Sequence, residues 1–103
     1  MSISKTILAS GQIAVAASVV FGITVTSNID PASPPTGPLV VNLLDESSNL
    51  GAGPIQCRII VSDQGMVPTE QVLFPAGLRL LKGISIIAVA NGHTDVTISV
   101  DYS

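Results

Sequence analysis

The chain has 103 residues, a formal net charge of −3, 47% hydrophobic residues and only 3% aromatic residues. This length provides one domain with a single core, and four scattered basic residues exclude the cationic stripe that a nucleic-acid partner requires. So many aliphatic side chains exceed what one small subunit can bury, which predicts contacts with partner subunits.

Residues 7–25 carry no charge, and a run of this length is what a bilayer span requires. The alternation within the run favours strands, because its apolar residues share one parity: Ile13, Val15, Ala17, Val19, Phe21, Ile23 and Val25. Gly11-Gln12 interrupts the run where we expect a turn. We therefore expect strands and no membrane association, and a membrane-anchored β-domain with a span at 7–25 stays open as the alternative.

The rest of the chain continues the same pattern of short apolar runs between Pro/Gly clusters, with no helical spacing. It predicts eight strands, at 3–9, 13–17, 19–27, 39–44, 55–62, 70–74, 84–90 and 96–102. Turns at intervals of about ten residues are typical of an all-β, antiparallel two-sheet β-sandwich of jelly-roll or immunoglobulin-like topology. We expect one domain over 1–103 with an N-terminal apolar strand segment at 1–18, and the pattern leaves the strand order open.

Two connections stand out by composition. Residues 30–38 hold four prolines, which cannot join the centre of a sheet because proline lacks a backbone donor and fixes its own φ. We expect an exposed, semi-rigid arm here, either inert or reaching across a neighbouring subunit. Residues 45–54 form the second flexible connection.

The last two strands are expected to form a hairpin, because Asn91-Gly92 between two alternating runs is a hairpin turn signal. In the final strand one parity should face inward: Val96, Ile98, Val100 and Tyr102. The run at 84–90 is apolar on both parities, whereas a two-layer sandwich gives each sheet one dry face. Its second face, which includes Ile87 and Val89, should therefore meet something outside the subunit.

The residues that could carry chemistry are few and dispersed. His93 lies beside Asp95 in the turn, and with Ser99 it suggests a triad, but we expect a solvated loop histidine because no nucleophile elbow surrounds any serine. Asp45 and Glu46 are neighbours that point to opposite faces, so they do not converge as an acid/base pair.

We therefore predict no catalytic residues and no cofactor. One histidine, one cysteine and seven dispersed acids also predict no metal site, except for a weak calcium site from loop carboxylates. Cys57 lies in an apolar run and reads as a small buried hydrophobe. The glycines of 51–54 precede a strand, so they serve a turn and provide no helix N-terminus for phosphate.

Charged residues beside apolar strands can anchor interfaces, although a solvated face is the simpler interpretation. Arg58 lies in mid-strand, where an outward arginine lays its stem along apolar surface. The hypothetical interface combines two arginines with the prolines of the arm and the second face of 84–90. It comprises Pro31, Pro34, Pro35, Pro38, Arg58, Arg79, Ile87 and Val89.

The order of these segments resembles that of small all-β virion proteins of tailed bacteriophages. The resemblance is carried by "GITVTS", "PLVVNLLDESS", "GPIQCRIIV", "FPAGLRLLKGISIIAV" and "VTISVDY", and within them by Pro75, Gly77, Leu78, Gly83, Val96, Thr97, Val100 and Tyr102. The chain departs from that pattern in its longer uncharged N-terminus and its proline arm.

The resemblance implies a non-enzymatic structural protein. On this basis we expect a capsid decoration (cement) protein, made in the host bacterial cytoplasm and located in the virion, with a neck, portal-adaptor or tail component as the alternative. Its expected partners are the major capsid protein or other virion proteins and further copies of itself, with a trimer favoured. No nucleic-acid partner is expected.

Overall fold

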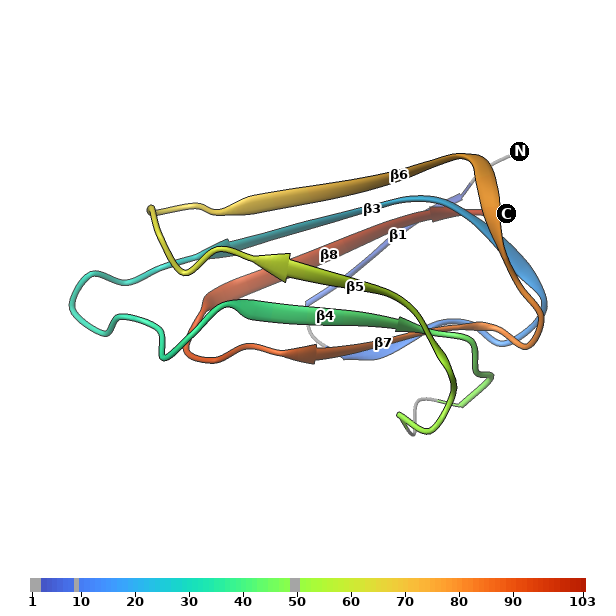
Figure 1. Cartoon of the computed structure of the whole chain (residues 1–103), viewed down its shortest axis with the longest axis horizontal. Coiled ribbons are helices and arrows are strands. Elements are labelled where there is room, and N and C mark those ends of the chain that lie inside the picture. Colours follow the sequence, from blue (N-terminus) through green and yellow to red (C-terminus); the bar gives the residue numbers. More distant parts are fainter. Residues whose placement is uncertain (1–2, 9, 49–50) are drawn as a thin grey trace.

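The computed structural model describes residues 3–8, 10–48 and 51–103, and the described residues contain strands and no helix. Figure 1 shows these strands in two stacked layers. The strands are β1 (Ile3–Ile7), β2 (Gly11–Ala14), β3 (Ser18–Asn28), β4 (Leu39–Leu44), β5 (Ile55–Val61), β6 (Thr69–Leu80), β7 (Ile84–Val89) and β8 (Thr94–Tyr102).

The strands form two four-stranded antiparallel sheets, so the predicted all-β sandwich is confirmed. Sheet A has the order β1-β8-β3-β6 and sheet B the order β2-β7-β4-β5. Strand β1 pairs with β8, β2 with β7, β3 with β6 and β4 with β5, as though one long hairpin had been rolled into a sandwich. This strand order is that of a jelly roll, which decides between the two topologies that the sequence left open.

The core lies between the sheets and is built almost entirely from aliphatic side chains. Val96, Ile98 and Val100 of β8 are buried and Tyr102 packs against them, which confirms the inward parity predicted for that strand. The largest fully buried side chains are Ile23, Leu39, Leu43, Leu80, Ile84, Ile86, Ile98, Val20, Val25, Val41, Val61 and Val100.

The single apolar parity predicted across 13–25 is wrong, because β3 contains a bulge. The register shifts between Val20 and Gly22 against both neighbouring strands. Val20 is therefore buried before the bulge and Ile23 after it, while Phe21 between them is exposed. An extra residue reverses which parity faces the core, which is why alternation alone misassigned this strand.

Strand β6 extends further than predicted, because Pro75 to Gly77 form a bulge and not a terminating turn. Leu73 lies opposite Gly22 and Leu78 opposite Val20, so four residues of β6 lie between those two rows where β3 has one, and Phe74 among them packs against the core. The strand then resumes to Leu80 with its side chain in the core. Proline is tolerated here because β6 is an edge strand.

The expected terminal hairpin is also wrong. The turn itself has the expected chemistry: Asn91 and Gly92 have φ values of 50° and 93°, and the His93 N–H donates to the Ala90 carbonyl over 3.0 Å. Strands β7 and β8, however, belong to different sheets, so this tight turn carries the chain from sheet B to sheet A. Turn residues specify local geometry and leave the partner of each strand undetermined.

The uncharged segment 7–25 contributes β2 and most of β3, one to each sheet. Gly11 and Gln12, expected in a turn, lie within β2 and pair with Ile86 and Ser85. The chain changes sheets after Ala14 instead. None of the described residues belongs to a helix long and apolar enough to cross a membrane.

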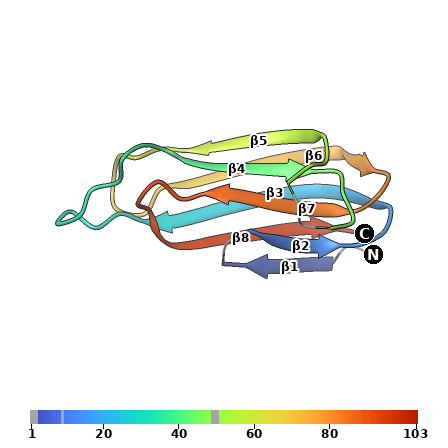
Figure 2. The ribbon, with the colours of Figure 1, turned by 90° about the horizontal axis from the view of Figure 1, so that it is seen from below.

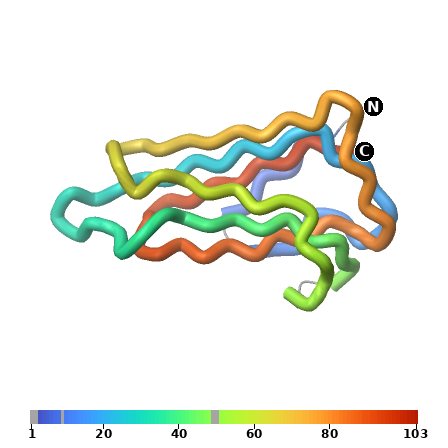
Figure 3. The backbone as a smooth tube through the Cα atoms, in the orientation of Figure 1, coloured from blue at the N-terminus to red at the C-terminus, as the bar shows by residue number. Residues whose placement is uncertain are grey.

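The sandwich has two different long sides, which Figure 2 shows on opposite edges of the molecule. The β5/β6 side is formed by the edge strands β5 and β6, and the β1/β2 side by the edge strands β1 and β2. The two short ends also differ. The β3–β4 connection extends beyond the sheets at one end, which we call the arm end, and the 45–54 connection lies towards the other (Figure 3).

The bulge in β6 provides a direct test of the fold. Gly77 has a φ of 82°, and a Cβ there would lie 2.5 Å from Cγ1 of Val19. We expect Gly77→Ala to lower the free energy of unfolding by about 2 kcal/mol or more, because a left-handed backbone and a clash with a stiff side chain combine. The measurement is the urea unfolding midpoint.

Gly65→Ala is the matched control. Gly65 has a similar φ of 86°, but nothing lies within 4 Å of the position that its Cβ would take. The control should cost about 1 kcal/mol from backbone strain alone. Equal losses in the two variants would contradict the close packing of the β6 bulge on β3.

Candidate functional site

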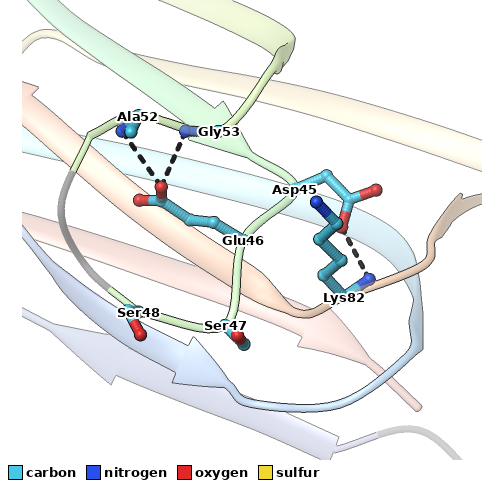
Figure 4. Close-up of a pocket in the computed structure, with 7 residues that line it drawn as sticks. All are labelled: Asp45, Glu46, Ser47, Ser48, Ala52, Gly53 and Lys82. Carbon is cyan, nitrogen blue, oxygen red and sulfur yellow. Dashed lines mark hydrogen bonds between the residues drawn. The ribbon is translucent and has the colours of Figure 1, made fainter.

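Asp45 follows β4 and fixes the β6–β7 turn. Its carboxylate accepts hydrogen bonds from the backbone N–H groups of Leu81 (3.0 Å), Lys82 (2.8 Å) and Gly83 (3.4 Å). Figure 4 shows the bond to Lys82, whose own backbone lies beside the carboxylate. The side chain therefore acts as a cap for the turn that links the two sheets.

Glu46, the next residue, fixes a different loop. Its carboxylate accepts hydrogen bonds from the backbone N–H groups of Gly51 (3.0 Å), Ala52 (3.1 Å) and Gly53 (2.8 Å), the last two drawn in Figure 4. The sequence alone favours a solvated loop for these two acids, and this expectation is wrong for Glu46, which is buried. The prediction that the two carboxylates point apart is confirmed, because each binds its own turn.

These hydrogen bonds determine the protonation of both acids. Burial by itself raises the pKa of the Asp45 carboxyl, but the bonds from the turn outweigh it and hold that pKa below 3.8. Burial also raises the pKa of Glu46, and the hydroxyl of Ser85 together with the 51–53 N–H groups brings it below 4.5. Both side chains stay ionised near neutral pH and have their oxygens engaged, so the arrangement suits loop closure and not proton transfer.

A pocket of about 240 Å³ lies between these loops and is lined by Asp45, Glu46, Ser47, Ser48, Ala52, Gly53 and Lys82. Its two carboxylates already bind backbone groups on their inner sides. Among the described residues, no three His, Cys, Asp or Glu side chains gather as a metal site requires. The pocket is therefore best described as the outer surface of two capped loops.

Gln12 closes the same end from within, a role that the sequence did not reveal. Its Nε2 lies 2.6 Å from the carbonyl oxygen of Ala14 and 2.9 Å from those of Glu46 and Ile84. Its own Oε1 is buried and has no partner among the described residues. One side-chain amide thus draws together the backbones of β2, β7 and the segment after β4.

His93 is buried, and the predicted solvated histidine is therefore wrong. Its Nε2 lies 3.1 Å from the Gly37 carbonyl, which can only accept, so Nε2 carries a hydrogen. In the neutral ring Nδ1 then accepts from the hydroxyl of Ser27, 2.8 Å away and fully buried. The imidazole ties the end of β3 to the proline arm, and no substrate can reach the serine.

The triad weighed from the sequence does not form. Asp95 accepts a hydrogen bond of 2.8 Å from Nδ2 of Asn28, and Ser99 lies on the outer face of sheet A beside Thr6 and Ser4. His93 binds Ser27 and Gly37 instead. Cys57 is half-buried against the core, and burial raises the pKa of its thiol.

The outer face of sheet B brings together three of the residues proposed for the interface, namely Arg58, Ile87 and Val89. Val89 lies opposite Val40, and Val40 opposite Ile60, so one apolar row crosses three strands. We call this row, Val40, Ile60 and Val89, the sheet B patch. Ile60 is 55% exposed and Val89 48% exposed.

The neighbouring row on this face joins Ile87, Asn42 and Arg58. Ile87 is half-buried, and a side chain added at Gly51 would lie 3.8 Å from its Cδ1, so the 51–54 segment partly covers it. Arg58 is exposed as predicted and donates from Nε to Oδ1 of Asn42 over 3.0 Å. The arginine therefore lies beside the sheet B patch with its direction fixed.

Arg79 lies elsewhere, opposite Val19 on sheet A, and so does not share a surface with Arg58. The outer face of sheet A is mixed: it carries the exposed side chains of Leu73, Asp101 and Arg79, and a polar row lies beside them. One row joins Thr6, Ser99, Thr24 and Gln71, and hydrogen bonds link Thr6 to Ser99 (3.4 Å) and Gln71 to Thr24 (3.3 Å).

The proline arm is held to its own subunit over its second half. The Thr36 N–H donates to the Asn91 carbonyl over 2.8 Å, and Nδ2 of Asn91 donates to the Pro38 carbonyl over 2.8 Å. Pro35 is half-buried, whereas Pro31, Pro34 and Pro38 are exposed. The exposed tip of the arm begins with a turn at Asp30. The Oδ1 atom of Asp30 accepts a hydrogen bond of 2.9 Å from the backbone N–H of Ala32.

No family model and no curated protein matches this chain. Among solved structures, it is similar to a chain of the structure titled "Bacillus endospore appendages form a novel family of disulfide-linked pili". That chain has 13% sequence identity and a TM-score of 0.45, and the match covers 99% of this chain and 87% of that one. A similarity at this level carries no argument about function.

The two carboxylate caps predict a specific dependence of stability on pH. Because folding lowers both pKa values, the unfolded chain binds more protons in acid. The contribution of these two carboxyls to the free energy of unfolding should be constant above about pH 6, fall as the pH passes below the ordinary carboxyl range, and keep falling until the folded-state pKa values are passed. Urea unfolding at a series of pH values measures this slope.

Glu46→Gln should flatten the acid slope by up to about one proton. Asp101→Asn, which changes an exposed carboxyl of β8, is the matched control and should leave the slope as it is. A slope that is unchanged by Glu46→Gln would contradict the capping role of this carboxylate.

Proposed function

We propose that this protein is a non-enzymatic structural subunit of a tailed-phage virion, of the capsid decoration type, which stabilises a shell through subunit contacts. The observation that supports the proposal best is the sheet B patch beside the proline arm. Val40 follows the exposed Pro38 by two residues, so the apolar row begins next to the arm. Exposed apolar side chains grouped in this way are typical of an interaction surface.

The charges on this surface are few and fixed in direction, which suits a protein partner. Arg58 beside Ile60 offers an arginine next to aliphatic side chains, a combination found at the centre of protein interfaces. In a decoration protein the strength of attachment comes from repetition as well as contact area, since each subunit binds a lattice of identical sites.

Other functions have weaker support in the described structure. Its buried Ser–His pair is closed to substrates, and its acids cap loops. The segment expected to span a membrane in the alternative hypothesis forms strands of both sheets. A neck, portal-adaptor or tail role would use the same kind of surface, and the number of copies per particle distinguishes it from a shell role.

The sheet B patch can be tested by charge insertion. We expect Ile60→Asp and Val89→Asp each to weaken binding to particles stripped of this protein by about tenfold or more, because a carboxylate would be buried against apolar partner atoms. Binding is measured by co-sedimentation with particles purified from the source culture. Gln64→Asp, in the exposed 62–68 loop, is the control and should bind normally.

Both patch variants should stay folded, with a free energy of unfolding within about 0.5 kcal/mol of the parent's, as is usual for surface substitutions. Urea unfolding measures this difference. Normal particle binding by folded Ile60→Asp and Val89→Asp would rule out this face as the attachment surface.

Copy number distinguishes the shell role from the neck role. A decoration protein should be present in hundreds of copies per particle, because it repeats over the shell lattice, whereas a neck or adaptor ring needs about a dozen. Quantitative mass spectrometry of purified particles, relative to the major shell protein, gives this number. Absence of the protein from particles would contradict every virion role.

A further inference from the structure

Within the described part of the chain, the two edge strands of sheet A have no pairing partner on their outer sides. Strand β6 has 12 residues and pairs there with β3, and β1 has five residues and pairs there with β8. An uncovered edge presents a row of backbone N–H and C=O groups that can pair with another chain. Figure 2 shows β1 and β6 on opposite long sides of the molecule, so each edge is open to a different neighbour.

The number of strands determines how two such edges would meet. Sheet A has four strands, each antiparallel to the next, so β1 and β6 run in opposite directions. A second copy shifted sideways in the same orientation therefore brings its β1 antiparallel to β6 of the first. The pairing type of the sheet is preserved without any rotation of the subunit.

The side chains on the outer face also continue across such a junction. The row that joins Thr6, Ser99, Thr24 and Gln71 begins at one edge and ends at the other. Two pairs of its members are hydrogen-bonded: Oγ1 of Thr6 donates to Oγ of Ser99 over 3.4 Å, and Nε2 of Gln71 donates to Oγ1 of Thr24 over 3.3 Å. Extending the row in register places Thr6 of the next copy beside Gln71, which adds another polar pair of the same kind.

The charges at the two edges are complementary. Lys5 is the charged residue of β1 and lies opposite Val100, while Glu70 of β6 lies opposite Val25, and both of these partners face the core. Lys5 and Glu70 are therefore on the same face of the sheet, and both are exposed. Continuing the rows places Lys5 beside Val72, diagonal to Glu70 and within reach of a long side chain.

The apolar features of the two sides lie at the same level along the strands. A pocket of about 190 Å³ opens on the β1/β2 side, lined by Leu8, Ser10, Ala88, Ala90 and Val96. On the β5/β6 side, Met66 is 69% exposed and Val67 59% exposed. Both features lie towards the arm end. Val96 of the pocket precedes Thr97, which pairs with Thr26 near the end of β3, and the Met66 carbonyl accepts a hydrogen bond from the N–H of Ile29, just after β3.

We infer that copies of this chain associate head to tail, with β1 of one copy added antiparallel to β6 of the next so that sheet A continues across subunits. Because the two surfaces differ, the contact is heterologous: a purely sideways shift extends an open chain, and a rotation added at each step closes a ring, such as a trimer. This inference goes beyond the proposed function, since it concerns contacts between copies and is tested without particles.

A disulfide placed across the junction tests the register. Thr6→Cys and Gln71→Cys are combined in a Cys57→Ala background and oxidised. Within one subunit β1 and β6 are three strand spacings apart, about 14 Å, whereas a disulfide requires Cα atoms about 4.4–6.8 Å apart. Only a contact between copies can therefore join them.

We expect covalent trimers or longer ladders on a non-reducing denaturing gel, and monomers from either single cysteine variant. Products that stop at the dimer, or dimers from Gln71→Cys alone, would indicate two-fold pairing of β6 with itself and overturn the inference. Monomers from the double variant, at concentrations where the parent sediments as an oligomer, would also overturn it, as would a parent that stays monomeric.

Charge reversal provides a second test that leaves the backbone intact. Lys5→Glu and Glu70→Lys should each weaken association about fivefold, because attraction becomes repulsion, and the double reversal should restore it to within about twofold. Sedimentation velocity gives the association constants. Additive losses in the double reversal would contradict the Lys5–Glu70 contact. Particle binding that persists in the parent, when the double cysteine variant gives no cross-linked products, would leave the proposed function standing while this inference fails.

Discussion

The aliphatic contact between the two sheets is the constraint on which the rest of the molecule depends. The interior is built from Val, Ile and Leu side chains of the two inner faces, and the chain has few aromatic residues to add to it. This aliphatic core lies between the strands, and the loops at their ends need other contacts. The ends are closed by polar side chains that bind backbone groups, and this is why the few buried polar residues lie there.

The two ends are closed in different ways. At one end Asp45, Glu46 and Gln12 hold three loops through their backbone N–H and carbonyl groups. At the other, His93 and Asn91 bind carbonyls of the proline arm. Residues that look like candidates for catalysis in the sequence are thus used to close the sandwich, and the surfaces left for function are the broad faces and the long edges.

The sequence predicted eight strands, and each predicted segment overlaps one observed strand, because short apolar runs between Pro/Gly clusters mark strands even where the alternation is incomplete, as in β1 and β7. The alternation failed where a bulge reverses the parity, at Phe21 and Gly22, and where β6 bulges at Pro75 and still returns to the core. Asn91-Gly92 specified a tight turn correctly but not the sheet that the following strand joins.

The polar closures could not be predicted, because their partners are far apart in sequence. His93 and Ser27 are separated by 66 residues, and Gln12 and Ile84 by 72. Only the Glu46 cap had a local signal, an acid followed by the glycine-rich segment 51–53, whose unencumbered N–H groups suit a carboxylate. The interface residues were placed on exposed surface, but the sequence could not tell that Arg58 and Arg79 lie on opposite sheets.

The position of β8 affects how the molecule folds. This strand is the last of the eight in the sequence, yet it lies inside sheet A between β1 and β3, which are among the first. During synthesis the early strands must therefore wait for the final one before that sheet can form, and their apolar surfaces stay unprotected meanwhile. Sheet A is therefore completed in a late step, after residue 102 has been synthesised. Its complete set of strands, with β1 and β6 at the two edges, forms only then.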